Sequence, residues 1–437
     1  MNRIKAKQPI IGWLLMLMRL KKLFGIYIIS LFPVCLFAQN DSVPRNIDYY
    51  LDFAVNSSPL LKDYGNQVLA SRLDSLAIRA QNKPQLNANG QALFIPGGGP
   101  GQFGYDAAIT NGGNYAAQVA ATQNIFNKNL LKPQYQAVNL QGQALKNTSK
   151  LSEHDLRHNV TSQYINAWAD QSQLQAAHQT LRIMKQQESL LKPLVQTGIM
   201  KQSAYLSFAM ELQSQELTIN QLHIQYEADL MTLNLLCGIA DTSSKIRLQE
   251  PGLVKRTVRY DYFSSPVYMQ YFIDSLQNIN QKLLVDVRYK PHLSWMADAG
   301  FLSSTPDLYL HPGVSVGLAL VFPIFDGGQR KLDYQRVNLQ EKTRLGYVSF
   351  YKDQYNSQFV LYNKQLKSTE MLNDKINAQL RVSGDLINMS SKELNTGDIS
   401  VTDFILILRN NIDLRNSLTQ NRVKEWQVIN DMNYYNW

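Results

Sequence analysis

The chain has 437 residues, of which 43 are Lys or Arg and 34 are Asp or Glu, giving a formal net charge of +9. Six of the basic residues lie in residues 1–38, so the remainder carries only +3 and shows no clustered basic face, which argues against a nucleic-acid partner. The two cysteines, Cys35 and Cys237, fall on either side of this boundary, so we expect no disulfide framework.

Residues 1–38 are predicted to be a secretory signal peptide. They contain no acidic residue and end in an apolar run, which is the pattern of a cleaved leader. We expect cleavage between Ala38 and Gln39. Val34, directly before Cys35, is larger than the residues that lipid-attachment signals place there, so we do not expect lipidation.

Four segments of the chain are predicted to be strands: about 86–95, 114–126, 293–302 and 314–325. In each, apolar and polar residues alternate, as on a strand with one apolar and one polar face. Each has about the ten residues that cross a bilayer at a tilt. No later stretch reaches the ~18 apolar residues of a membrane-spanning helix.

The polar rows of these strands consist of Asn, Gln, Ser, Thr and small residues, as in a water-filled barrel lumen. An ordinary half-buried sheet is the alternative reading of such alternation. Four strands are too few to enclose a lumen, because small closed barrels need about eight. We therefore expect several copies of the chain to contribute strands to one barrel.

Long helices are predicted after each pair of strands, at about 133–196 and 202–238 and again at about 329–395 and 401–434. Apolar residues with a spacing of 3.5 continue across a short turn in each pair, which predicts antiparallel coiled-coil hairpins. In the last helix Asn411, Asn421 and Glu425 interrupt the apolar seam, so we expect that helix to face water more than protein. Residues 240–263 are predicted to be a linker with little structure of its own.

The two halves of the sequence repeat each other. Residues 135–141 (Tyr-Gln-Ala-Val-Asn-Leu-Gln) return 199 positions later as 334–340 (Tyr-Gln-Arg-Val-Asn-Leu-Gln), and Ser57-Ser58-Pro59 returns 207 positions later as Ser264-Ser265-Pro266. We therefore expect residues 39–239 and 264–437 to share one fold. The difference in offset falls in a Gly-rich loop of the first half, where a change of length is tolerated.

Two patterns that suggest chemistry have simpler interpretations. His154 and His158 lie at positions i and i+4 of a helix, which is the spacing of zinc ligands, but no third ligand follows, and a solvated helix surface fits better. Residues 97–104 are Gly-rich but lack the Lys and Ser/Thr of a phosphate-binding loop. We expect no catalytic residues, no metal and no cofactor, and hence no enzyme.

The strand-to-helix junction at 322–328 (Phe-Pro-Ile-Phe-Asp-Gly-Gly) and the entry segment at 56–59 (Asn-Ser-Ser-Pro) resemble the TolC-like outer membrane efflux protein family. The resemblance covers nearly all of residues 46–437. It implies an α+β membrane protein that forms a homotrimer, in which twelve strands build one β-barrel in outer membrane lipid and the helices continue it as a periplasmic tunnel.

The resemblance also places a gate at the periplasmic tip of the tunnel. Asp403 aligns with the first gating aspartate of the family, Leu406 replaces the second, and Asp398 is a weaker candidate for the same constriction. An Asp that favours the start of a helix is the alternative interpretation of Asp403. The turns at Thr197-Gly198 and Thr396-Gly397 are expected to face a periplasmic adaptor protein.

The resemblance implies the outer membrane channel of a tripartite efflux or secretion system, a passive exit duct for small molecules supplied by an inner-membrane transporter. A channel of a type I protein secretion system is the alternative within this class. A soluble periplasmic coiled-coil adaptor is the alternative from a different class, but it gives no reason for four matched amphipathic strands.

Overall fold

The computed structural model describes residues 44–96, 113–125, 128–198, 200–241, 246–256, 262–305, 307 and 312–436. The predicted leader with Cys35, the Gly-rich loop 97–104 and parts of the linker therefore lie outside the described residues. The chain divides into two compact units. The smaller comprises residues 1–45 and 245–247 and contains β1 (Pro44–Arg45) and the first residue of β4 (Arg247–Leu248). Everything below concerns the larger unit.

The larger unit contains the same series of elements twice. The first half has α2 (Ile47–Ser57), α3 (Pro59–Gln81), β2 (Gln85–Phe94), β3 (Gly113–Ile125), α5 (Lys128–Gln196) and α6 (Gln202–Cys237). The second half has η1 (Tyr262–Ser264), α7 (Pro266–Arg288), β5 (His292–Ser303), β6 (Pro312–Val321), α8 (Gln329–Thr396) and α9 (Val401–Tyr435). The long helices match closely, with 69 residues in α5 and 68 in α8.

The helices that precede the first long strand of each half, α3 and α7, begin with the same cap. Ser58 accepts a hydrogen bond from the backbone N–H of Leu61, and Ser265 accepts one from Tyr268. Pro59 and Pro266 then occupy the first helical positions, where a missing N–H costs nothing. The Ser-Ser-Pro repeat in the sequence thus marks two equivalent helix starts.

The four long strands form one antiparallel sheet in the order β2-β3-β5-β6. The two halves meet at β3 and β5, where Ala120 lies opposite Asp298. The strands begin and end within two residues of the predictions except at the end of β6. That strand stops at Val321 because Pro323, which has no backbone N–H, follows closely.

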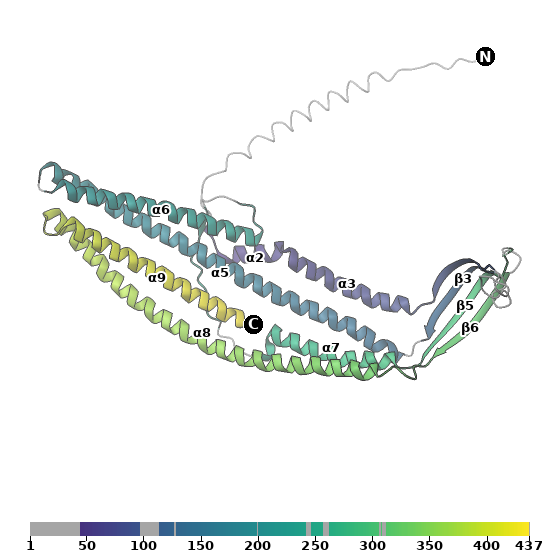
Figure 1. The fold of residues 1–437 in the computed structure, drawn as a ribbon. Coiled ribbons are helices and arrows are strands. Elements are labelled where there is room, and N and C mark those ends of the chain that lie inside the picture. The colour runs from purple at the N-terminus through teal and green to yellow at the C-terminus, as the bar shows by residue number, and fades with distance from the viewer. Residues whose placement is uncertain are drawn as a thin grey trace, which may run out of the picture. The chain divides into compact units, whose positions relative to one another are not determined.

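The helices form two long antiparallel hairpins, α5 with α6 and α8 with α9 (Figure 1), and α5 also packs against α9. The predicted seam of α6 is buried at Phe208, Leu212 and Ile219. Gln215, a polar break in that seam, is buried as well and donates a hydrogen bond to the carbonyl of Ala177 at 3.2 Å. No helix within the described ranges has an apolar stretch long enough to cross a membrane.

The expectation that α9 faces water was wrong. Asn411 and Asn421 are each only 5% exposed. Asn411 donates to Ser383 of α8 at 2.9 Å, and Asn421 donates to the carbonyl of Thr369 at 2.8 Å. Because a buried amide can satisfy its donors across a helix pair, these residues are part of the α8–α9 interface.

The start of α5 also differs from the prediction. Pro133 was expected at the first helical position, but the helix already begins at Lys128, so Pro133 lies within its second turn. The carbonyl of Pro133 accepts a hydrogen bond from the buried side chain of Asn280 on α7 at 2.9 Å. This contact with α7 helps to fix the helix start, which local sequence alone does not show.

The linker is held by side chains of the long helices. Gln171 of α5 both donates to and accepts from the backbone of Leu248, at 2.9 and 2.7 Å. Asn433 of α9 accepts from the backbone N–H of Arg256 at 2.9 Å and donates to the carbonyl of Val254 at 3.1 Å. Residues 248–256, the part of the segment to which these bonds belong, are thus bonded through their backbone to α5 and α9.

Candidate functional sites

The turn between α5 and α6 is built by Thr197 and Gly198. Gly198 has φ of 76°, the left-handed conformation that ends many helices. The Thr197 hydroxyl donates to the carbonyls of Pro193 and Leu194, both at 3.2 Å, so it satisfies acceptors that the helix end leaves free. Both residues of the turn are exposed.

The turn between α8 and α9 has the same construction. Gly397 has φ of 82°, and the Thr396 hydroxyl lies 3.0 Å from the carbonyl of Glu393. Both residues are exposed here too. The repeated Thr-Gly pair is therefore explained by helix termination, and an adaptor contact at these turns stays a prediction.

The ends of all four long helices share one apolar core. Its buried members are Met184, Leu191, Phe208, Leu212, Ile387, Leu394, Val401, Phe404 and Leu408. An ion pair on the surface joins the two hairpins, because Arg409 of α9 contacts both carboxylate oxygens of Glu211 on α6, at 2.9 and 2.5 Å. The two tips are thus packed as a single body, and a movement of one hairpin would have to break this core.

Asp403 lies in the first turn of α9 and is exposed. Its backbone N–H donates to the Ser400 side chain at 3.1 Å, and the Ser400 hydroxyl donates to the Asp403 carboxylate at 2.7 Å. This reciprocal pair resembles a capping box, and the carboxylate lies at the positive end of the helix. The geometry therefore supports the helix-start role of Asp403, while a gating role stays a prediction.

Leu406 follows Asp403 by three positions, so the two side chains lie on one face of α9. Leu406 is 57% exposed. Asp398 is also exposed, but it accepts a hydrogen bond from Thr396 within the turn. Asp403 and Leu406 consequently form one exposed surface, and Asp398 belongs to the turn.

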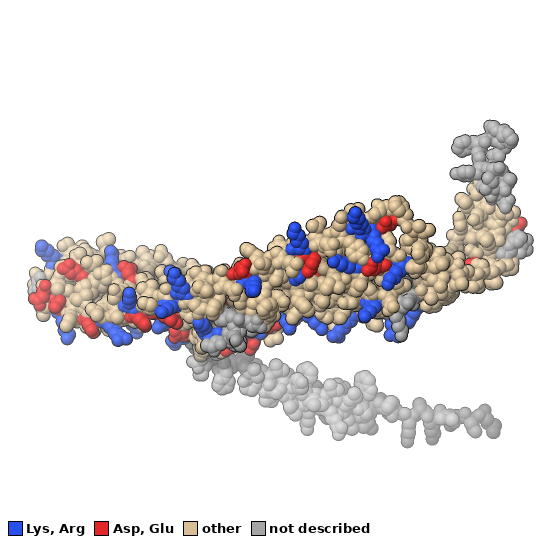
Figure 2. Space-filling view, turned by 90° about the horizontal axis from the view of Figure 1, so that it is seen from below, with Lys and Arg blue, Asp and Glu red and all other residues tan. Residues whose placement is uncertain are grey.

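The sheet has the two faces that the sequence predicts. Residues opposite one another in neighbouring strands share a face, so the register places Ala121, Ala297 and Val316 together on one side. This side is apolar and exposed, with Val314 at 82%, Val316 at 83% and Leu318 at 72%. Figure 2 shows the contrast between the nearly uncharged sheet and the charged helices. An apolar surface of this extent needs a partner or a lipid environment.

The other face of the sheet is polar. Its rows contain Asn87, Asn89, Gln118 and Ser315, together with Asp298. The Asp298 carboxylate accepts hydrogen bonds from Gln118 at 3.3 Å and from Ser315. Asp298 is the only acidic residue on the four long strands, and the sequence analysis did not identify it as a candidate.

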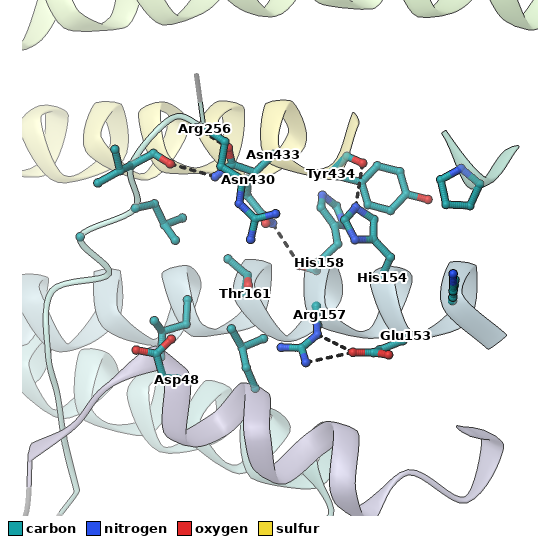
Figure 3. Close-up of a pocket in the computed structure, with 17 residues that line it drawn as sticks. Asp48, Glu153, His154, Arg157, His158, Thr161, Arg256, Asn430, Asn433 and Tyr434 are labelled. Carbon is teal, nitrogen blue, oxygen red and sulfur yellow. Dashed lines mark hydrogen bonds and ion pairs between the residues drawn. The ribbon is translucent and has the colours of Figure 1, made fainter. Parts of the chain in front are cut away.

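The His154 and His158 pair lies beside a cavity of about 640 Å³ between α2, α5 and α9 (Figure 3). Nε2 of His154 is 2.7 Å from the carbonyl of Tyr434, and Nε2 of His158 is 2.8 Å from a carboxylate oxygen of Asp431. Burial lowers the pKa of His154. These imidazoles connect α5 to α9, and the described residues contain no cluster suited to a metal ion.

The larger unit is thus a duplicated strand-strand-hairpin fold whose sheet is apolar on one face and polar on the other. No protein-family model matches the sequence, and a search of curated proteins also finds no match. Solved structures therefore supply the comparison.

Three solved structures illustrate the similarity. CusC, which changes conformation on folding and transmembrane channel formation, has 17% identity, covers 92% of this chain and 95% of its own, and gives a TM-score of 0.69. The Campylobacter jejuni outer membrane channel CmeC has 14% identity, covers 90% of this chain and 85% of its own, and gives a TM-score of 0.70. The Neisseria gonorrhoeae outer membrane channel MtrE, in its open state, has 12% identity, covers 89% of this chain and 88% of its own, and gives a TM-score of 0.69. The chain has the fold of these channels, as its resemblance to the TolC-like family predicts.

Proposed function

We propose that the protein is a trimeric outer membrane channel and acts as the passive exit duct of a tripartite efflux system. The observation that carries this proposal is the sheet. Its apolar face is exposed, its opposite face is polar, and its strands have the length that crosses a bilayer. A soluble coiled-coil adaptor has no use for such a surface.

Closure of the sheet supports the trimer. In the order β2-β3-β5-β6, the outer edges of β2 and β6 pair with no other described strand. Open edges are not tolerated in lipid, because each free N–H or C=O there costs several kcal/mol. If β6 of each copy pairs with β2 of the next, three copies form a barrel of twelve strands with no open edge. The polar rows would then line its lumen.

The helical hairpins supply the rest of the duct. α8 follows directly from β6 and has 68 residues, which corresponds to roughly 100 Å of helix at ~1.5 Å per residue. We propose that three copies of these hairpins form a periplasmic tunnel. A periplasmic adaptor would contact the Thr197-Gly198 and Thr396-Gly397 turns, and an inner-membrane transporter would supply small molecules and the energy for export.

Membrane fractionation and electrophoresis test this proposal. The full chain, expressed with its own leader in a Gram-negative host, should remain with outer membranes after washing with high salt and carbonate. It should migrate as a trimer when unheated and as a monomer after boiling. Release by the carbonate wash, or a monomer in mild detergent, would refute the channel and favour the adaptor.

The predicted leader has its own test. Mass spectrometry of the purified protein should find an N-terminus near Gln39. A diacylated N-terminal peptide beginning at Cys35 would show that the signal peptide was assigned incorrectly. This result would change how the N-terminus is anchored and would leave the channel proposal intact.

A further inference from the structure

Asp298 is the feature of the sheet that the proposed function leaves unexplained. The four long strands contain no Lys or Arg. Their only charged or readily charged side chains are Asp298 and His292, which lies at the start of β5. The register places it near the middle of the sheet, opposite Ala120 on β3 and Ser315 on β6. An ionisable residue in a membrane-spanning segment, facing a water-filled cavity, marks an ion or substrate pathway.

Neighbouring strands fix the Asp298 carboxylate in place. Gln118 donates to one carboxylate oxygen at 3.3 Å, and Ser315 donates to the other. No ion pair forms at Asp298 within the part of the chain that the structure describes. The negative charge is therefore held on the polar face without a cation to neutralise it.

The hydrogen bonds alone do not account for this charge. An Asn side chain has nearly the same shape, can accept from Gln118 with its carbonyl oxygen, and can pair with the Ser315 hydroxyl through its amide. The hydrogen-bonding pattern around residue 298 therefore does not require a carboxylate. We therefore infer that the role of Asp298 depends on its negative charge.

We propose that Asp298 determines the charge selectivity of the barrel. In a trimer, three copies of this carboxylate face the lumen at one level, where they attract cationic solutes and repel anionic ones. The substrate class favoured by the barrel is therefore cationic. The inference rests on the proposed function, because it requires the sheet to close around a lumen with its polar face inward.

This selectivity element is separate from the predicted gate. Asp298 lies in the sheet, whereas Asp403 follows the far end of α8, roughly 100 Å of helix away. Charges interact in salt solution over only about 8 Å. The two residues should therefore act independently, and substitutions at one should not alter the effect of substitutions at the other.

Planar-bilayer recordings with the full-length trimer under a KCl gradient test the inference. The wild type should prefer K⁺ over Cl⁻. Asp298→Asn should lower this permeability ratio by at least about threefold while leaving trimer yield and thermal stability unchanged. Asp298→Glu, which keeps the charge, should retain the preference, and Asp298→Lys should reverse it.

Restoring the charge chemically provides a second measurement. The two native cysteines should not interfere, because Cys35 lies in the predicted leader and Cys237 is buried, with burial raising its thiol pKa to about 12. An Asp298→Cys channel should lose the cation preference. It should regain this preference after reaction with a negatively charged sulfonatoethyl methanethiosulfonate, whereas the trimethylammonium reagent should make the channel prefer anions.

The outcomes distinguish this inference from the proposed function. If the wild type forms no channels, the proposed function fails and the inference fails with it. If channels form and Asp298→Asn keeps the wild-type permeability ratio, the channel stands and the role of Asp298 is refuted. Channels in which Asp298→Cys does not respond to either reagent would also refute it, because the side chain would then not face the lumen.

Discussion

At the scale of single residues, Asp403 has two interpretations that differ in what its charge does. As a helix-start residue its charge acts locally, because the carboxylate accepts a hydrogen bond from Ser400 near the positive end of α9 and binds no ion. As a gate residue it needs the negative charge, because three carboxylates around one axis would bind cations. The Asp403→Asn substitution therefore separates the two roles.

We predict that wild-type channels conduct weakly and are blocked by divalent or trivalent cations from the periplasmic side. Asp403→Asn should raise the blocking concentration about tenfold, equivalent to ~1.4 kcal/mol, with trimer assembly intact. Asp398→Asn should have a smaller effect, since Asp398 is bonded within the turn. Leu406→Asp should strengthen the block. Planar-bilayer recordings measure all three, and an unchanged block in Asp403→Asn would leave this residue with its capping role alone.

A glycine inside α8 and the glycine that ends it should respond oppositely to the same substitution. Gly397 has φ of 82°, where a Cβ costs about 1–2 kcal/mol, so Gly397→Ala should lower the stability of the tip. Gly384 lies inside the helix with no atom within 4 Å of an added Cβ, so Gly384→Ala should raise stability by up to about 1 kcal/mol. Thermal unfolding followed by circular dichroism measures both. Equal effects would show that the turn is not fixed in its left-handed conformation.

At the scale of elements, a carboxyl pair links α5 to α6. Asp170 is hydrogen-bonded to Asp229, and burial, followed by this contact, raises the pKa of Asp170 to about 7. The same hydrogen bond lowers the pKa of Asp229, which also accepts from Gln163 at 3.2 Å. One proton is therefore shared between the two helices near neutral pH.

This pair should make the α5–α6 hairpin less stable as the pH rises to 8. An unfolded chain loses the Asp170 proton near pH 3.8, whereas the folded chain keeps it up to about pH 7. The stabilisation is therefore complete below about pH 4 and is lost as the pH rises through 7. Asp229 does not offset this trend, because its lowered pKa leaves it ionised throughout that range.

We expect Asp170→Asn, which imitates the protonated carboxyl, to be more stable than the wild type at pH 8 and to depend less on pH between 5 and 8. Asp385→Asn, at an exposed position of α8, is the matched control and should keep the wild-type pH dependence. Thermal unfolding across this pH range is the measurement. Parallel curves for wild type and Asp170→Asn would contradict proton sharing.

The buried asparagines of α9 give a further prediction for a helix pair. Asn421→Ala removes the donor to the carbonyl of Thr369 and to the side chain of Asn373, both at 2.8 Å. Leaving buried acceptors unpaired costs about 1–3 kcal/mol. Gln420→Ala, at the exposed neighbouring position, should cost less than about 0.5 kcal/mol. Equal losses of unfolding free energy would mean that α9 faces water after all.

At the scale of the whole molecule, the sequence predicted the repeat and the order of the strands and helices well. Strand alternation and the Ser-Ser-Pro starts are local signals, so they are readable without a structure. The sequence-based prediction failed where contacts with another helix determine whether a residue is buried or where a helix begins. Asn411 and Asn421 look solvent-exposed until α8 supplies their acceptors, and Pro133 looks like a helix start until α7 is in place.

The candidate sites show the same limit. The family resemblance selected Asp403 and the Thr-Gly turns, but a side chain's role in a pore depends on other copies of the chain. Asp298 was visible in the sequence as one acid on a polar row. Its candidacy depends on the structure, in which Gln118 and Ser315 donate hydrogen bonds to its carboxylate and no described residue forms an ion pair with it.

The final prediction tests which face of the sheet contacts lipid. Neighbouring residues of β2 lie on opposite faces and can therefore be compared directly. Ala88 lies opposite Val119 on the apolar face, and Asn89 lies opposite Gln118 on the polar face. If the apolar face meets lipid, Ala88→Lys should destabilise the inserted trimer by about 2–4 kcal/mol, the cost of a Lys near the bilayer midplane. Asn89→Lys places the same charge in a water-filled lumen and should assemble at wild-type levels. The yield of heat-modifiable trimer in outer membranes measures both, and the inverse result would mean that the polar face is the one in contact with lipid.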